Sequence, residues 1–157
     1  MIRRAVANDV GTILRLIKEL AAYEREPDAV VATEAGLLRD GFGDAPLFQV
    51  LLAEHEGRPV GFAFYFLQYS TWRGGPVLYL EDLFVEVSHR GRGLGKALMQ
   101  ALASEAVLLG CSRIQWAVLD WNTPSIVFYE SLGACVLKQW LTVRVEGEAL
   151  KKLAKTC

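Results

Sequence analysis

The stretch Arg90-Gly91-Arg92-Gly93-Leu94-Gly95-Lys96 lies between two segments of different character and decides how the surrounding chain folds. The apolar segment before it, residues 77–87, predicts a strand, and the amphipathic segment after it, to about residue 109, predicts a helix. Glycines let backbone N–H groups approach a ligand closely, and a helix start points unpaired N–H groups and a positive dipole end at the same place. The stretch therefore predicts an anion site, most often one for phosphate.

Two well-known phosphate motifs do not match this stretch. A Walker loop requires GxxxxGK followed by Ser or Thr, but Arg90 stands at the first glycine position and Ala97 follows Lys96. A dinucleotide fingerprint requires GxGxxG in a regular βαβ unit, but Lys96 occupies the last glycine position and no such unit surrounds it. A plain structural turn is the remaining alternative, although three alternating glycines followed by a lysine exceed what a turn needs.

Composition bounds the class of protein. The 157 residues are 52% hydrophobic and 22% charged, which predicts one domain over residues 1–157 with a substantial core. A net charge of −1 argues against a general affinity for nucleic acid. The cysteines, Cys111, Cys135 and Cys157, have neither a paired framework nor metal spacing, and we expect reduced, buried thiols and no metal. No secretory or membrane segment is evident, so we expect a cytoplasmic protein.

The order of predicted elements favours a mixed sheet over a regular βαβ alternation. One strand precedes two helices, three strands follow, and the chain then continues as helix, strand, helix, strand and a terminal helix. The predicted strands are residues 2–6, 48–54, 60–69, 77–87, 113–119 and 137–145. This order predicts an α/β (α+β) chain whose mixed sheet carries helices on both faces.

Arg90 to Gly95 match the R/Q-x-x-G-x-G/A signature of the GCN5-related N-acetyltransferases, the GNAT superfamily, which the chain resembles. The resemblance implies a central, mixed, mostly antiparallel twisted sheet flanked by helices, and a signature that binds the pyrophosphate of acetyl-CoA. Residues 16–24, 78–85 and 121–129 look like the spermidine/spermine (diamine) acetyltransferase family within it, a similarity that fades after Gly133. Many members of that family are homodimers, so we expect a homodimer.

The resemblance also implies which residues contact acetyl-CoA. The backbone of residues 83–85 would pair with the acetyl-pantetheine arm like an added strand. The glycine stretch would hold the pyrophosphate, with charge from Arg90 and Lys96. The expected contacts are Leu83, Phe84, Val85, Arg90, Gly91, Arg92, Gly93, Leu94, Gly95, Lys96, Asn122 and Ser125.

Acetyl transfer to an amine requires that the amine lose its proton. A primary alkylamine has a pKa of about 10.4, so a neutral amine at pH 7 costs about 4–5 kcal/mol. Glu81 and Asp82 stand in mid-strand, where charges are unusual, and strand neighbours point to opposite faces. By resemblance we prefer Glu81 as the substrate-facing acid, acting directly or through water, although both carboxylates could instead pair with Arg or Lys.

Tyr129 follows Asn122-x-Pro124-Ser125 at the family's catalytic tyrosine position, which implies that it protonates the departing thiolate. A phenol of pKa about 10 can donate to a thiolate of pKa about 8.5. No cysteine lies in these motifs to serve as a nucleophile, which favours direct transfer in a ternary complex.

The acceptor is the least determined part of the prediction. The resemblance associates five residues with the amine substrate: Tyr23, Glu24, Glu81, Gln115 and Trp116. Asp82 is added as the second mid-strand acid beside Glu81. We expect a diamine or polyamine, with thialysine or another amino-acid-like amine as the alternative, and the run from Glu24 to Glu26 could instead be a solvated charged face. A non-catalytic acyl-CoA-binding module is the alternative from a different class.

Overall fold

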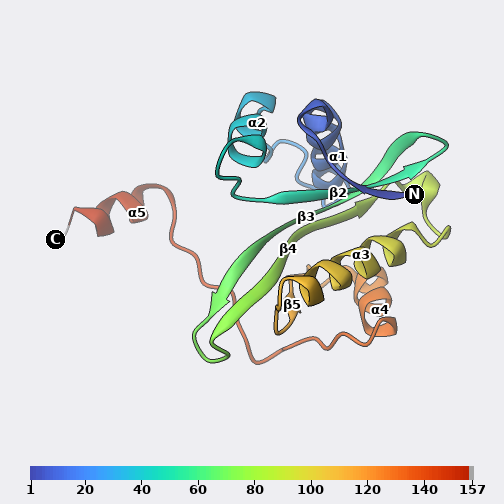
Figure 1. Cartoon of the computed structure of the whole chain (residues 1–157). Helices are drawn as coiled ribbons and strands as arrows, with labels where there is room; N and C mark the ends of the chain where they lie inside the picture. Colours follow the sequence, from blue (N-terminus) through green and yellow to red (C-terminus); the bar gives the residue numbers. More distant parts are fainter. Residues whose placement is uncertain (156–157) are drawn as a thin grey trace. The chain divides into compact units, whose positions relative to one another are not determined.

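The computed structural model describes residues 1–155, which divide into two compact units, Met1–Ala117 and the described residues from Val118 onward. A five-stranded sheet is the centre of the first unit (Figure 1). The strands follow chain order across the sheet: β1 (Ile2–Arg4), β2 (Gln49–His55), β3 (Arg58–Ser70), β4 (Gly75–Val85) and β5 (Ile114–Gln115). Pairing is antiparallel from β1 to β4 and parallel between β4 and β5, which confirms the predicted mixed, mostly antiparallel sheet.

Helices cover both faces of this sheet (Figure 1). Helices α1 (Val10–Tyr23) and α2 (Glu34–Phe42) lie on one face, and α3 (Leu94–Leu108) lies on the other. Thr33 accepts the N–H of Gly36 at 3.1 Å and so caps α2. The core between α1, α2 and the sheet is built from Val10, Ile13, Leu16, Leu20, Leu37, Phe48, Val50, Leu52, Phe62 and Phe84. The first unit thus holds β4 rigidly between two layers.

Strand β4 has two irregularities in its middle. On the β3 side, Phe64 pairs with Asp82 and Tyr65 pairs with Leu80, so Glu81 is an extra residue in a β-bulge. On the β5 side, only Leu78 and Tyr79 are paired, so among the described residues β4 has no strand partner there from Leu80 onward.

Short helices flank this sheet, η1 (Ala7–Asp9) before α1 and η2 (Val87–His89) soon after β4.

The second unit contains α4 (Thr123–Ser131) and α5 (Gly147–Ala154). Gly133 has φ +89° just beyond α4, as expected of a glycine that ends a helix. The strand predicted over residues 137–145 is wrong, because this part of the described chain has no ladder partner and its apolar side chains stay exposed. The predicted burial of the thiols is also wrong: Cys135 is exposed and Cys111 half-buried, both free, while Cys157 lies outside the described residues.

Candidate active site

The glycine stretch begins after η2 and runs into the first turn of α3. Gly91 and Gly93 have φ of +75° and +79°, in the left-handed region that side chains disfavour. A Cβ added at either residue would meet no described atom within 4 Å. Gly93 is the N-cap of α3, and its C=O accepts the N–H of Ala97 at 2.9 Å. Open space in front of a helix start fits a bound phosphate group.

The last residues of β4 offer an unpaired edge beside this cradle. The N–H of Glu86 donates to the C=O of Val60 at 2.9 Å, so residue 86 faces β3. Because an antiparallel ladder alternates, Phe84 also faces β3, and the N–H and C=O groups of Leu83 and Val85 point to the opposite edge. An extended acyl carrier could pair with that edge, as expected for residues 83–85. The chain's own groups thus fit both the arm and the pyrophosphate of a coenzyme A thioester.

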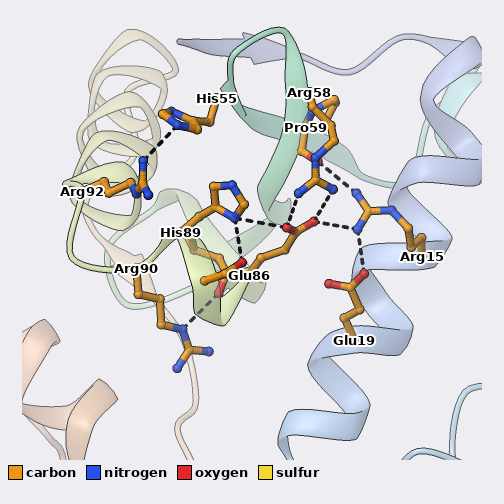
Figure 2. Close-up of polar contacts among 11 residues, drawn as sticks. Arg15, Glu19, His55, Arg58, Pro59, Glu86, His89, Arg90 and Arg92 are labelled. Atoms are coloured by element: carbon orange, nitrogen blue, oxygen red, sulfur yellow. Dashed lines mark hydrogen bonds and ion pairs between the residues drawn. The ribbon is translucent and has the colours of Figure 1, made fainter.

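Glu86 anchors the chain between β4 and the glycine stretch, and the sequence did not predict this role. Its buried carboxylate receives Arg15 Nη1 at 2.7 Å and both Nη atoms of Arg58, at 3.0 and 2.5 Å (Figure 2). His89 Nδ1 lies 3.3 Å from the same carboxylate. Burial alone would raise the pKa of Glu86, but the hydrogen bonds from Arg58 and Arg15 outweigh it and lower that pKa. No local pattern indicates this cluster, since α1, β3 and the end of β4 each supply part of it.

Arg90 folds back onto the sheet. Its Nε–H donates to the C=O of Val85 at 3.0 Å (Figure 2). Its guanidinium carbon lies 4.3 Å from the centre of the Tyr23 ring and 5.7 Å from that of Phe84. Arg92, which is exposed as Arg90 is, places Nη1 3.0 Å from His55 Nε2. The two arginines of the stretch therefore have different surroundings, which the glycine motif does not distinguish.

The charges of two other carboxylates act on Asp82, next to the bulge. Asp82 is half-buried, and burial, together with the charges of Glu81 and Glu24, raises its pKa to about 7. Burial also raises the pKa of Glu24, which directly follows the last residue of α1. Glu81 is exposed. The bulge interrupts the strict alternation of side chains at Glu81, and the separate roles expected for Glu81 and Asp82 stay a prediction.

The other predicted substrate residues divide between two places in the first unit. Tyr23 lies with its ring centre 6.4 Å from that of Phe84, next to Glu24. Gln115 and the half-buried Trp116 lie at β5, where Gln115 is paired with Tyr79 and accepts Arg113 Nε at 3.1 Å. The structure therefore gathers Tyr23, Glu24 and the β4 acids at one end of α1. Their contact with a substrate stays a prediction.

The second unit carries the remaining predicted residues on α4. Asn122 is buried, and its side-chain oxygen accepts the N–H of Ser125 at 3.4 Å, which caps the helix. Tyr129 is half-buried, with its ring centre 5.4 Å from that of Phe128. Within this unit Asn122 and Ser125 share the first turn of α4, and Tyr129 lies one turn further along. In residues 1–155 no group of three or more His, Cys, Asp or Glu side chains is placed to hold a metal.

A glycine cradle at a helix start, beside an unpaired strand edge, defines a class of protein that takes an acyl group from a coenzyme A thioester. Residues 13–134 match the Acetyltransferase (GNAT) family model, and the chain belongs to this family. The match crosses the boundary between the two units. Acetyl-CoA is the acetyl donor of the family, so the protein is an acetyl-CoA-dependent N-acetyltransferase.

Relatives and solved structures agree with this assignment. The chain is 42% identical over 165 residues to a thialysine N-epsilon-acetyltransferase of Bos taurus, covering 98% of this chain and 96% of that one. It is 44% identical over 163 residues to spermidine/spermine N(1)-acetyltransferase-like protein 1 of Homo sapiens, covering 98% of this chain and 23% of that longer protein. An integron cassette protein from the mobile metagenome of V. cholerae matches with TM-score 0.83 at 30% identity, covering 99% of this chain and 98% of that one.

Proposed function

We propose that this enzyme acetylates a primary amine of a small molecule that carries a second positive charge, a diamine or polyamine. The observation that carries this proposal is the group of interacting carboxylates Glu24, Glu81 and Asp82. Close carboxylates repel one another, so Asp82 gives up its proton more easily when a cation is near. A dication offers one charge to Glu24 while its other nitrogen, oriented by Glu81, reacts.

The three acids have different roles in this proposal. Glu81, exposed at the bulge, faces the substrate, as the sequence predicts, and orients the amine. Asp82 is the better proton acceptor, because it is half-buried and its pKa of about 7 lies near the working pH. Glu24 holds the distant cation. Asp82 takes the proton of the ammonium group, which frees the nitrogen lone pair for attack on the thioester carbonyl.

The donor side follows from the geometry of β4. The free N–H groups of Leu83 and Val85 hold the acyl arm, and one of them donates to the oxygen that becomes negative when the carbon–nitrogen bond forms. The N–H groups of residues 91–96 hold the pyrophosphate, with Lys96 adding charge and Arg92 at the rim. Tyr129 gives its phenolic proton to the sulfur as the carbon–sulfur bond breaks, and Asn122 and Ser125 contact the donor.

A second acceptor class, an amino-acid-like amine, has its own support. Three mammalian relatives, each 42% identical to this chain, are named thialysine N-epsilon-acetyltransferases. Thialysine carries an α-carboxylate at the end opposite its ε-amine, and Glu24, placed to hold the distant charge, would repel it. For this reason we place the diamine first.

A matched amine panel tests the proposal. Purified enzyme is given acetyl-CoA and, at equal concentration, putrescine, 1,3-diaminopropane, spermidine, lysine, thialysine and n-butylamine, and free thiol release is followed. We expect the largest kcat/KM for a dication without a carboxylate, and a fall of about tenfold or more with butylamine, which lacks the second charge. A preference for thialysine would support the second class, and barely detectable rates with every amine would refute both.

We also propose a homodimer in the cytoplasm. In the second unit, apolar side chains stand exposed along the segment predicted as a strand, with Leu141 84% and Val143 91% accessible, and α5 exposes Leu150 and Leu153. A period-2 apolar segment without a ladder partner is suited to pairing with a second copy. The free thiols of Cys111 and Cys135 fit a reducing compartment.

Light scattering after size exclusion tests the dimer. Val143→Lys should lower the measured mass toward that of one chain, whereas Val31→Lys, at a 90% exposed residue of the first unit, should leave it unchanged. A wild-type protein that stays a monomer at about 100 μM would overturn this part of the proposal.

A further inference from the structure

The contacts of Arg90 differ from those expected of a phosphate ligand. Its Nε–H donates to Val85 C=O, which belongs to the open edge of β4. Its guanidinium carbon lies over the Tyr23 ring and, at a longer distance, over the Phe84 ring. A guanidinium placed in this way interacts with the π-electrons of the ring through its face while its edge donates hydrogen bonds.

The phosphate cradle does not need Arg90. Gly91 and Gly93 adopt the backbone conformation that exposes N–H groups, and the start of α3 supplies the dipole. Lys96, in the first turn of α3, and Arg92, whose Nη1 lies 3.0 Å from His55 Nε2, are the other two cations of the stretch, and both are exposed. Charge for a pyrophosphate is therefore present without the guanidinium that covers Tyr23.

Arg90 instead connects the donor side of the site to the acceptor side. Tyr23 is the last residue of α1 and precedes Glu24, one of the acids proposed to hold the amine. Val85 ends β4, the strand proposed to hold the acyl arm. We propose that Arg90 is a positioning residue that fixes Tyr23, and with it the amine site, against the donor strand, rather than a ligand of the donor's phosphates. This inference rests on the proposed function for the identity of the acceptor side.

Two donors that differ only in the nucleotide part separate these roles. Acetyl-CoA carries the pyrophosphate, and S-acetylpantetheine has the same acyl arm and no phosphate. Initial rates are measured with both donors and the best amine of the panel, for wild type, Arg90→Ala, Arg90→Lys and Lys96→Ala. The affinity for coenzyme A is measured by calorimetry at low and high salt, a readout that does not depend on amine turnover.

A positioning role predicts that Arg90→Ala raises the amine KM about tenfold with both donors and changes the Kd for coenzyme A less than threefold. Arg90→Lys should not rescue, because an ammonium group lacks the planar face and the Nε–H. Lys96→Ala should lower kcat/KM for acetyl-CoA much more than for S-acetylpantetheine. Tyr23→Leu removes the other partner of the same contact and should raise the amine KM as much as Arg90→Ala does. The double variant should show no further rise in the amine KM.

The opposite pattern would overturn the inference. Arg90 would be a phosphate ligand if Arg90→Ala lowers the rate with acetyl-CoA but not with S-acetylpantetheine, if Arg90→Lys restores that rate, and if high salt diminishes the effect on coenzyme A binding. If Arg90→Ala does not fold, Arg90→Gln and Tyr23→Leu carry the test. A wild type that binds coenzyme A but acetylates no amine would refute the proposed function, and the calorimetry would still decide whether Arg90 binds phosphate.

Discussion

Replacing Asp82 by asparagine should stabilise the protein at alkaline pH and change little at acidic pH. Burial, and then the charges of Glu81 and Glu24, raise the pKa of Asp82 from 3.8 to about 7 in the folded chain. The unfolded chain loses this proton near pH 4. Between about pH 4 and pH 7 the folded state therefore holds a proton that the unfolded state has released, so the free energy of unfolding decreases as pH rises through this window.

The size of the effect follows from the two pKa values. One pKa unit corresponds to about 1.36 kcal/mol, so complete ionisation of folded Asp82 costs about 4 kcal/mol. Asp82 ionises at lower pH in the unfolded chain, and about 2–3 kcal/mol of the destabilisation accumulates as pH rises from 5 to 8. Asparagine has nearly the same shape and no charge, so the variant avoids this cost. The difference in unfolding free energy between Asp82→Asn and wild type should grow by about 2–3 kcal/mol over this range.

Urea unfolding at pH 5, 6, 7 and 8 measures this difference. Asp44→Asn, at an exposed carboxyl between α2 and β2, is the control and should show no such trend. Asp82→Asn should also lose the rise in kcat/KM for the amine that wild type shows near pH 7, because an amide cannot accept the proton. A difference that stays constant within 0.5 kcal/mol (about the error of such measurements) would refute both the burial and the charge argument for Asp82.

Three further predictions concern other parts of the site. Gly61→Ala should weaken coenzyme A binding at least fivefold by calorimetry, because its Cβ would lie 2.8 Å from Phe84 O and displace the end of β4, whereas Gly75→Ala meets open space and should bind like wild type. Glu86→Gln should lower the unfolding free energy by about 1–3 kcal/mol at pH 7. Because the pKa of Glu86 is lowered in the folded chain, this loss of stability should shrink as pH falls below about 4.5. An equal loss of stability at pH 3.5 would contradict the charge argument. Tyr129→Phe should lower kcat about 100-fold with coenzyme A affinity unchanged, and unaltered turnover would exclude the acid role.

Local features of the fold were predictable from the sequence. The glycine stretch, the strand before it and the helix after it each depend on residues close together in the chain, and the structure places β4, the Gly93 cap and α3 accordingly. The strands predicted over residues 48–54 and 60–69 correspond to β2 and β3 for the same reason. Apolar periodicity and turn residues act over a few positions, which is the distance over which a sequence pattern carries information.

Features that depend on distant partners were missed. One extra residue in a strand leaves no mark on an apolar pattern, so the bulge at Glu81 could not be foreseen. Residues 137–145 have the alternation of a strand, but alternation does not supply a neighbour to pair with. An arginine beside glycines suggests a phosphate ligand, and its contact with Tyr23, far away in the chain, becomes visible only in three dimensions.

The unpaired edge of β4 has a consequence for the protein when no donor is bound. A strand edge without a partner strand is a template for any other extended chain, and such edges promote aggregation. On this edge the C=O of Val85 accepts from Arg90, but Leu83 and Val85 have no strand partner among the described residues, and Val85 and its neighbour Phe84 are buried and apolar. An acyl carrier that pairs with the edge would shield it, so acetyl-CoA should act as a stabiliser of the folded, dispersed protein as well as a substrate.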